Sequence, residues 1–168
     1  MRIIVALISL GVAISLLGVL GFRFNLTESL PPGVYRVTAG SPTHGSIVQV
    51  CLPRRVAEFA RARGYLGPGK CPARVRPLGK VVLAVGGDVV RIEPEGIRVN
   101  GEMIANSRTA VQDRHGRPVP HHPWGVYRLP SGELWLFSDH RSAYDSRYFG
   151  PVHEEHVVAV LEPWWVQR

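Results

Sequence analysis

The chain has 168 residues, and its 20 Lys and Arg residues exceed its 13 Asp and Glu residues, which gives a formal net charge of +7. This length allows one domain with a real core and hardly a second one. The basic residues are spread along the chain and form no cluster that alternates with aromatic residues, so no nucleic-acid partner is expected. We expect instead a basic, solvated surface close to anionic lipid.

Residues 3–22, IIVALISLGVAISLLGVLGF, contain no charged side chain. A helix of about 20 residues spans about 30 Å, the thickness of the hydrocarbon core of a bilayer. The run is longer than a usual signal-peptide core and lacks an A-x-A cleavage pattern, so a removed signal peptide is the weaker alternative. We therefore predict a single-pass transmembrane signal-anchor at 1–22 in the inner (cytoplasmic) membrane. Residues 23–168 then form a domain on the periplasmic, extracytoplasmic side.

The sequence pattern of residues 23–168 predicts a β-rich fold. Short apolar runs bounded by Gly and Pro predict strands at 47–50, 80–85, 89–92, 97–99, 125–129, 134–137 and 157–161. Asn100-Gly101 predicts a two-residue hairpin loop after the fourth of these runs. One helix is expected at 53–63, because Pro53 suits a first helical turn and Gly64 a helix end. The predicted fold class is mainly β with one short helix.

Cys51 and Cys71 are the two cysteines of the chain. In an oxidising compartment an isolated pair predicts one disulfide, which closes a loop of about 20 residues and contributes about 3 kcal/mol on the chain-entropy model. The pair has no CxxC spacing, and His153-x-x-His156 is a weak match to a helical ligand pair. We expect no metal site and no cofactor.

Ser29 stands out among the serines because it closely follows the apolar segment and precedes Leu30, Pro31, Pro32 and Gly33. A residue that precedes proline is pushed out of the helical region, so this stretch predicts a stiff, exposed turn near the bilayer surface. A serine hydroxyl is a weak nucleophile and needs an adjacent base. The sequence must therefore supply that base elsewhere.

Lys80 is the best candidate for the base. Only two of the 20 basic residues are lysines, and Lys80 opens an apolar strand whereas Lys70 lies in a turn. Burial disfavours the ammonium form and lowers the pKa of a lysine, which yields a neutral amine able to accept a proton. A lysine at a strand edge that reaches water is the structural alternative. A Ser-His-Asp triad through His140 or His122 is the chemical alternative.

A third polar cluster, SDHRSAYDSRYFGPV at 138–152, directly follows the apolar run 134–137. Dense charge after a core strand indicates either a structural ion-pair network or a shell that braces a catalytic lysine or serine. Both roles predict that Asp145 and Arg147 are buried and paired.

Together these three clusters resemble the signal peptidase I family of Ser-Lys membrane peptidases. TESLPPG resembles its nucleophile box, KVVLAVGGDVV its general-base box with Lys80 and Asp88, and the segment 138–152 its final Asp-Ser-Arg box. Within the family, Ser29-Leu30-Pro31-Pro32-Gly33-Val34-Tyr35 is similar to the Ser-hydrophobic-Pro-x-Gly-x-Tyr signature of the TraF-type conjugative transfer peptidases. The resemblance implies the β-rich catalytic fold shared by signal peptidases and LexA-type peptidases.

The resemblance also implies the residue roles. Ser29 corresponds to the nucleophile, Lys80 to the general base and Asp145 to an aspartate needed for activity. The Ser29 backbone N–H and Thr27 correspond to the oxyanion hole. Supporting roles fall to Asp139, Ser142 and Arg147; Ser142 is the preferred lysine-bracing serine, ahead of Ser146. The final box begins Ser138-Asp139-His140 where the family has Gly-Asp-Asn.

The substrate that the resemblance implies is a pilin precursor or another membrane-bound preprotein, matured alongside conjugation or type IV secretion components. Some members also join the trimmed pilin into a ring. Two alternatives stay open: a general signal peptidase I for secreted preproteins, and a non-catalytic anchored scaffold domain of a secretion complex.

Overall fold

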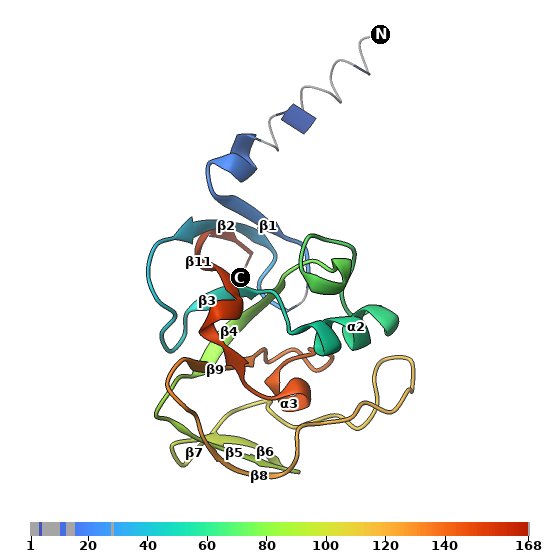
Figure 1. Cartoon of the computed structure of the whole chain (residues 1–168), viewed down its shortest axis with the longest axis vertical. Coiled ribbons are helices and arrows are strands. Elements are labelled where there is room, and N and C mark those ends of the chain that lie inside the picture. The colour runs from blue at the N-terminus through green and yellow to red at the C-terminus, as the bar shows by residue number, and fades with distance from the viewer. Residues whose placement is uncertain (1–3, 5–10, 13–15, 28, 168) are drawn as a thin grey trace.

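The computed structural model describes residues 4, 11–12, 16–27 and 29–167. Within them the chain forms two antiparallel sheets with short helices at their margins (Figure 1). One sheet has seven strands in the order β1-β2-β11-β3-β4-β9-β10, and the other has four in the order β7-β6-β5-β8. This arrangement confirms the mainly β class predicted from the sequence.

The strands of the larger sheet are β1 (Phe22–Asn25), β2 (Gly33–Thr38), β3 (Ile47–Val50), β4 (Leu78–Ala84), β9 (Glu133–Phe137), β10 (Val152–His153) and β11 (Val157–Val166). Those of the smaller sheet are β5 (Val89–Glu93), β6 (Gly96–Val99), β7 (Glu102–Met103) and β8 (Gly125–Arg128). The helical segments are α2 (Arg54–Ala62), α3 (Ser146–Phe149), η1 (Pro72–Arg74) and η2 (Glu154–His156). Each run predicted as a strand overlaps one of these strands.

The sequence pattern does not indicate β1 and β2, the two strands that flank Ser29. Phe22, assigned to the anchor by its hydropathy, instead begins β1 and pairs with Arg36 of β2. The remainder of the predicted anchor falls largely on residues 1–3, 5–10 and 13–15, outside the described part of the chain. No helix built from described residues is long and apolar enough to cross a bilayer.

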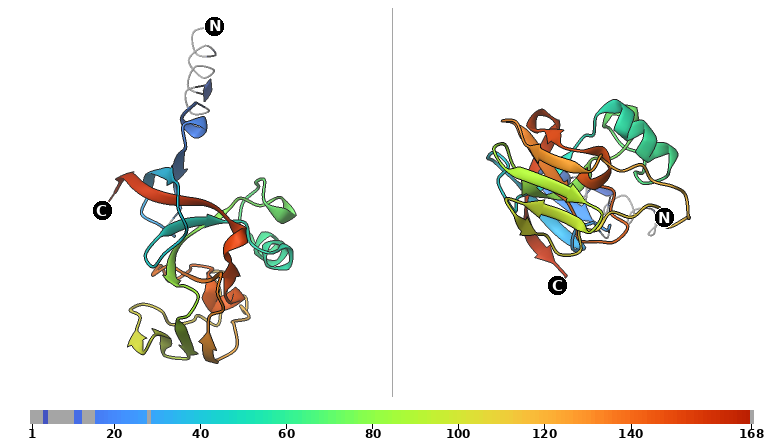
Figure 2. Two further views of the ribbon diagram at one scale, coloured as in Figure 1. Left: turned by 60° about the vertical axis from the view of Figure 1, so that its left-hand side comes forward. Right: turned by 90° about the horizontal axis from the view of Figure 1, so that it is seen from below.

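Two buried clusters fix the positions of the sheets. One joins the larger sheet to α2, through residues such as Val48, Leu52 and Ala60. The other joins the two sheets around the buried Trp135 and Ile92. As Figures 1 and 2 show, β1 and β2 lie toward the N-terminal end of the molecule and the smaller sheet lies at the opposite end.

Two local predictions are confirmed. Cys51 and Cys71 form a disulfide, with 5.3 Å between their Cα atoms, and α2 lies in the loop that it closes. Asn100 and Gly101 connect β6 to β7 with φ values of 50° and 91°, the left-handed conformation that a two-residue hairpin loop of this kind requires.

Candidate active site

Ser29 lies on the short connection between β1 and β2, which pair as far as Asn25 and Gly33. The side-chain amide of Asn25 holds this connection in place. Its Nδ2 donates to the carbonyl oxygens of Thr27 and Leu30, each at 2.9 Å, and its Oδ1 accepts a 2.7 Å hydrogen bond from the Thr27 hydroxyl. One side chain therefore fastens the backbone on both sides of Ser29.

The residues after Ser29 have separate structural reasons for their identity. Tyr35 is fully buried, and its hydroxyl donates a 2.6 Å hydrogen bond to the carbonyl of Pro31. Gly33 has a φ of 154°, and a Cβ there would lie 2.3 Å from the carbonyl oxygen of Trp165 on β11. Only glycine permits that close backbone approach. The segment Ser-Leu-Pro-Pro-Gly-Val-Tyr therefore forms a turn that contacts β11 through Gly33 and is hydrogen-bonded within its own hairpin through Tyr35.

Lys80 lies at the third position of β4, where buried and partly exposed residues alternate. The period of two places its side chain on the buried face together with Leu78 and Val82. Lys80 is 0% exposed, and its Nζ has no hydrogen-bond partner among the described residues. Burial lowers the pKa of this amine from 10.5 to about 8, opposed by the charge of Asp145 and assisted by that of Arg147. The prediction that Lys80 is buried is confirmed.

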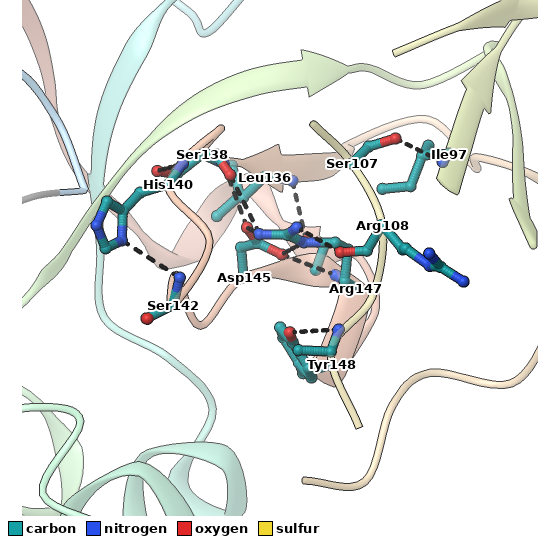
Figure 3. A network of polar contacts seen from close by, with 12 residues as sticks. Ile97, Ser107, Arg108, Leu136, Ser138, His140, Ser142, Asp145, Arg147 and Tyr148 are labelled. Atoms are coloured by element: carbon teal, nitrogen blue, oxygen red, sulfur yellow. Dashed lines mark hydrogen bonds and ion pairs between the residues drawn. The ribbon is translucent and has the colours of Figure 1, made fainter. Parts of the chain in front are cut away.

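Asp145 and Arg147 form a buried, bidentate ion pair, as the sequence predicts (Figure 3). The guanidinium donates to the two carboxylate oxygens at 2.8 and 2.7 Å and also to the carbonyls of Ser138 and Arg108. Asp145 accepts the backbone N–H of Ser138 in addition. The pair therefore joins the end of β9 to α3 and to the connection that carries Arg108.

A cavity of about 500 Å³ brings several of the predicted residues together. Its lining includes Ser29, Lys80 and Thr27 from the first two boxes, and His140 and Ser142 from the third. These residues are far apart in the sequence. The β1–β2 connection reaches β4 through Leu30, which packs against Gly79, although β11 and β3 separate β2 from β4 in the sheet.

Other predicted residues lie elsewhere. Asp139 is exposed and is absent from the described lining of this cavity. His122, the second candidate base, packs against Trp135 and Tyr127 and is also absent from that lining. Burial is the first cause of its lowered pKa, and His121 is the second. Lys70 is exposed.

Neither serine considered as a brace for Lys80 hydrogen-bonds to its Nζ. Ser142 is exposed, and its backbone N–H donates to His140 Nδ1. Ser146 is buried, and its hydroxyl accepts the backbone N–H of Leu136. The sequence suggests that a serine hydroxyl contacts Lys80. In the structure neither serine does so, and the charges of Asp145 and Arg147 act on the pKa of Lys80.

The signal peptidase family, peptidase S26, matches residues 1–165. The chain belongs to this family. It is 35% identical to a plasmid transfer protein TraF of Escherichia coli over 168 residues, which covers 96% of this chain and 94% of that protein. It is 39% identical to a probable conjugal transfer protein TraF of Sinorhizobium fredii over 135 residues, 79% of this chain and 70% of that protein.

A more distant similarity, 27% identity over 90 residues, joins this chain to signal peptidase I V of Bacillus subtilis and covers 49% of this chain and 54% of that protein. The resemblance to TraF-type members of the signal peptidase family, inferred from three short boxes, is thus confirmed over most of the chain.

Proposed function

We propose that this peptidase is a membrane-anchored serine endopeptidase with a Ser29–Lys80 dyad that matures a pilin precursor for conjugative transfer. The observation that carries the proposal is a fully buried lysine whose pKa is lowered to about 8 and which lines the same cavity as Ser29. With this pKa about a tenth of the lysine is neutral at pH 7, far more than for an unperturbed lysine, and the neutral amine is the form that a general base requires.

In the proposed reaction, neutral Lys80 accepts the hydroxyl proton of Ser29 while the serine oxygen attacks the scissile carbonyl carbon. The backbone N–H of Ser29 and a donor near Thr27 stabilise the oxyanion that forms. Protonated Lys80 then gives its proton to the departing amine, and an ester to Ser29 remains. Attack by water on this ester yields a trimmed chain, whereas attack by the substrate's own amino group yields a ring.

Asp145 and Arg147 support the dyad by positioning. Their charges act on Lys80 in opposite directions, so the pair keeps the environment of the amine nearly neutral. An unpaired carboxylate at that place would favour the ammonium form and abolish the base. Arg147 therefore has a function beyond stability, because its charge offsets the effect of Asp145 on the pKa of Lys80.

An apolar surface near Ser29 supports attachment to a membrane. Phe24, Leu26, Trp164 and Trp165 are all exposed, and Leu26 also lines the cavity. Tryptophan favours the interface between headgroups and hydrocarbon, where its ring meets lipid and its N–H meets water. Phe22, the last residue of the uncharged segment and the first of β1, contacts Trp164 edge to face. We infer that this surface faces the outer leaflet of the inner membrane.

The names of the two TraF relatives, which refer to plasmid transfer and conjugal transfer, support a substrate from the conjugation machinery. We infer that this substrate is a pilin precursor and that type IV secretion components are partners. The test is to incubate the membrane-embedded protein with pilin precursors and with secretory preproteins, and to read product masses. We expect cleavage of a pilin precursor, and a ring would lack one further water relative to the trimmed linear chain.

Three variants decide between the proposal and its alternatives. Ser29→Ala and Lys80→Arg should both abolish processing, whereas His140→Ala should retain it. Processing by Lys80→Arg at the rate of the unaltered chain would disprove the dyad. Assembly supported by Ser29→Ala would favour a scaffold, and cleavage of preproteins alone would favour a general signal peptidase.

A further inference from the structure

The cavity that holds Ser29 and Lys80 has an unusual charge distribution. Four arginines line it, and one of them, Arg63, lies beside Asp113. The other three come from separate parts of the chain: Arg76 precedes β4, Arg114 lies in the long connection between β7 and β8, and Arg141 follows β9. All three side chains are exposed, and none makes a hydrogen bond or ion pair with another described residue. We call these three residues the cationic rim.

Among the described residues, acidic side chains are almost absent from the same lining. Of the described acidic residues, only Asp113 lines the cavity. Its carboxylate is already occupied, because Oδ2 accepts from Tyr65 and from Arg117 Nε, each at 2.8 Å, and Arg63 lies 3.9 Å away. Glu28, the sequence neighbour of Ser29, lies outside the described residues. The cationic rim is therefore not neutralised by the carboxylate that faces the cavity with it.

Some exposed arginines elsewhere have acidic neighbours: Arg54 lies 3.6 Å from Glu58, and Arg91 lies 3.6 Å from Glu93. Others, such as Arg55, form no ion pair with a described residue, but they lie outside the cavity lining. The cationic rim differs because three such arginines line one cavity. Three unpaired cations around a concave site focus a positive potential where a substrate binds. A guanidinium in such a site favours carboxylate groups, with which it forms two parallel hydrogen bonds.

We propose that the cationic rim selects substrates that carry a carboxylate within a few residues of the scissile bond, either an Asp or Glu side chain or a free C-terminal carboxylate. This inference rests on the proposed peptidase function, since it assigns the substrate class of that cavity. Arg76 also lines a second cavity, whose lining shares Leu26 and Thr27 with the first. A substrate chain that passes Ser29 and continues in either cavity would therefore lie near Arg76.

The test separates binding from cleavage. Fluorescent peptides of one sequence, with Glu or Gln placed at each position around the cleaved bond and with a C-terminal acid or amide, are bound to the detergent-solubilised full-length Ser29→Ala variant. Binding to this variant does not need the dyad. We expect at least one Glu peptide, or the C-terminal acid, to bind about tenfold more tightly than its neutral match. The gain should fall as salt is raised.

Charge reversal identifies the residues responsible. Arg76→Glu, Arg114→Glu and Arg141→Glu, each in the Ser29→Ala background, should reduce the acidic preference, and at least one should reverse it toward a Lys peptide. Arg55→Glu is the matched control, because Arg55 is exposed on α2 and lies outside the described cavity lining while its change in net charge is the same. It should leave the preference intact.

The outcomes are distinct. Equal binding of acidic and neutral peptides, or equal loss in Arg55→Glu and the rim variants, overturns the inference even when the unaltered chain cleaves the peptides. Rim variants that lose binding only to vesicles containing anionic lipid, with peptide preference unchanged, overturn it in favour of a lipid contact. Acid-dependent binding without any cleavage by the unaltered chain supports the rim and rejects the peptidase function.

Discussion

Leu30, the residue after Ser29, packs on Gly79, the residue before Lys80: a Cβ at Gly79 would lie 3.0 Å from Leu30 Cδ1. Leu30 is buried, so its side chain has little room to move away. This contact sets the β1–β2 connection directly against β4. It is the packing that holds the proposed nucleophile beside the proposed base.

Gly79→Ala should therefore lower activity more than stability. The added methyl group displaces Leu30 by a few tenths of an ångström and with it Ser29, and small misplacements of reacting groups reduce rates by about 100-fold. We expect kcat to fall by about tenfold to 100-fold with a small change in urea midpoint. Leu30→Ala in the same background relieves the crowding, and failure of Gly79→Ala to affect kcat would show that this contact does not position Ser29.

Thr27 and Asn25 should have unequal effects. The Thr27 hydroxyl donates to Asn25 Oδ1 in the free protein, and the Asn25 amide fastens the backbone around Ser29. Thr27→Val removes one oxyanion donor at most, which elsewhere costs about 3 kcal/mol in the transition state. Asn25→Ala should be at least as damaging, because it frees the whole connection. Kinetics of the two single variants and of the double variant measure this; a silent Asn25→Ala would contradict it.

We expect the loss of Asp145 alone to destabilise the fold more than the replacement of Asp145 and Arg147 together. Asp145→Asn leaves a buried guanidinium uncompensated, which costs about 3–5 kcal/mol. The matched control is Asp139→Asn at an exposed position, with an expected change within about 0.5 kcal/mol. Urea unfolding measures both. Replacing the pair together, as Asp145→Leu with Arg147→Met, should recover much of the loss, and equal effects of the two Asp→Asn variants would refute the assignment.

Lys80 should lower the stability of the fold at neutral pH. Its pKa is about 8 in the folded protein and about 10.4 in an unfolded chain, so the unfolded state binds more protons between these values and stability rises with pH across that window. Lys80→Met should therefore stabilise the protein at pH 7, by on the order of 3 kcal/mol, and the gain should vanish near pH 10.5.

The control for this measurement is Lys70→Met, at an exposed position, which should change the urea midpoint little at either pH. A Lys80→Met variant that is less stable than the unaltered chain at pH 7 would mean that Lys80 is charged and satisfied within the fold.

The sequence predicts the elements whose signals are local. Most strands, the helix between the cysteines, the disulfide and the hairpin at Asn100-Gly101 follow from periodicity, Pro and Gly positions and cysteine count. The strands β1 and β2 escape prediction because Phe22 continues the hydropathy of the preceding segment, and because the prolines before β2 mask its start. On its other edge β2 pairs with β11, more than 100 residues later in the chain, and no local signal predicts that contact.

The candidate site shows the same division. Ser29, Lys80, Asp145 and Arg147 are recognisable from box order and from the rarity of lysine. Asn25 is not, because its role depends on the hydrogen bonds of a folded turn. The rim arginines are equally hidden, because each has its own sequence context and only the tertiary arrangement brings them to one cavity.

The pH dependence of kcat/KM for processing by the unaltered chain tests the central claim most directly, because it reports the ionisation of the base in the free protein. We predict a rate that rises with pH through an apparent pKa of about 8 and then levels off, as neutral Lys80 becomes available. A rising limb centred near 6.5, the range of histidine, or a rate independent of pH between 6 and 9, would contradict Lys80 as the base.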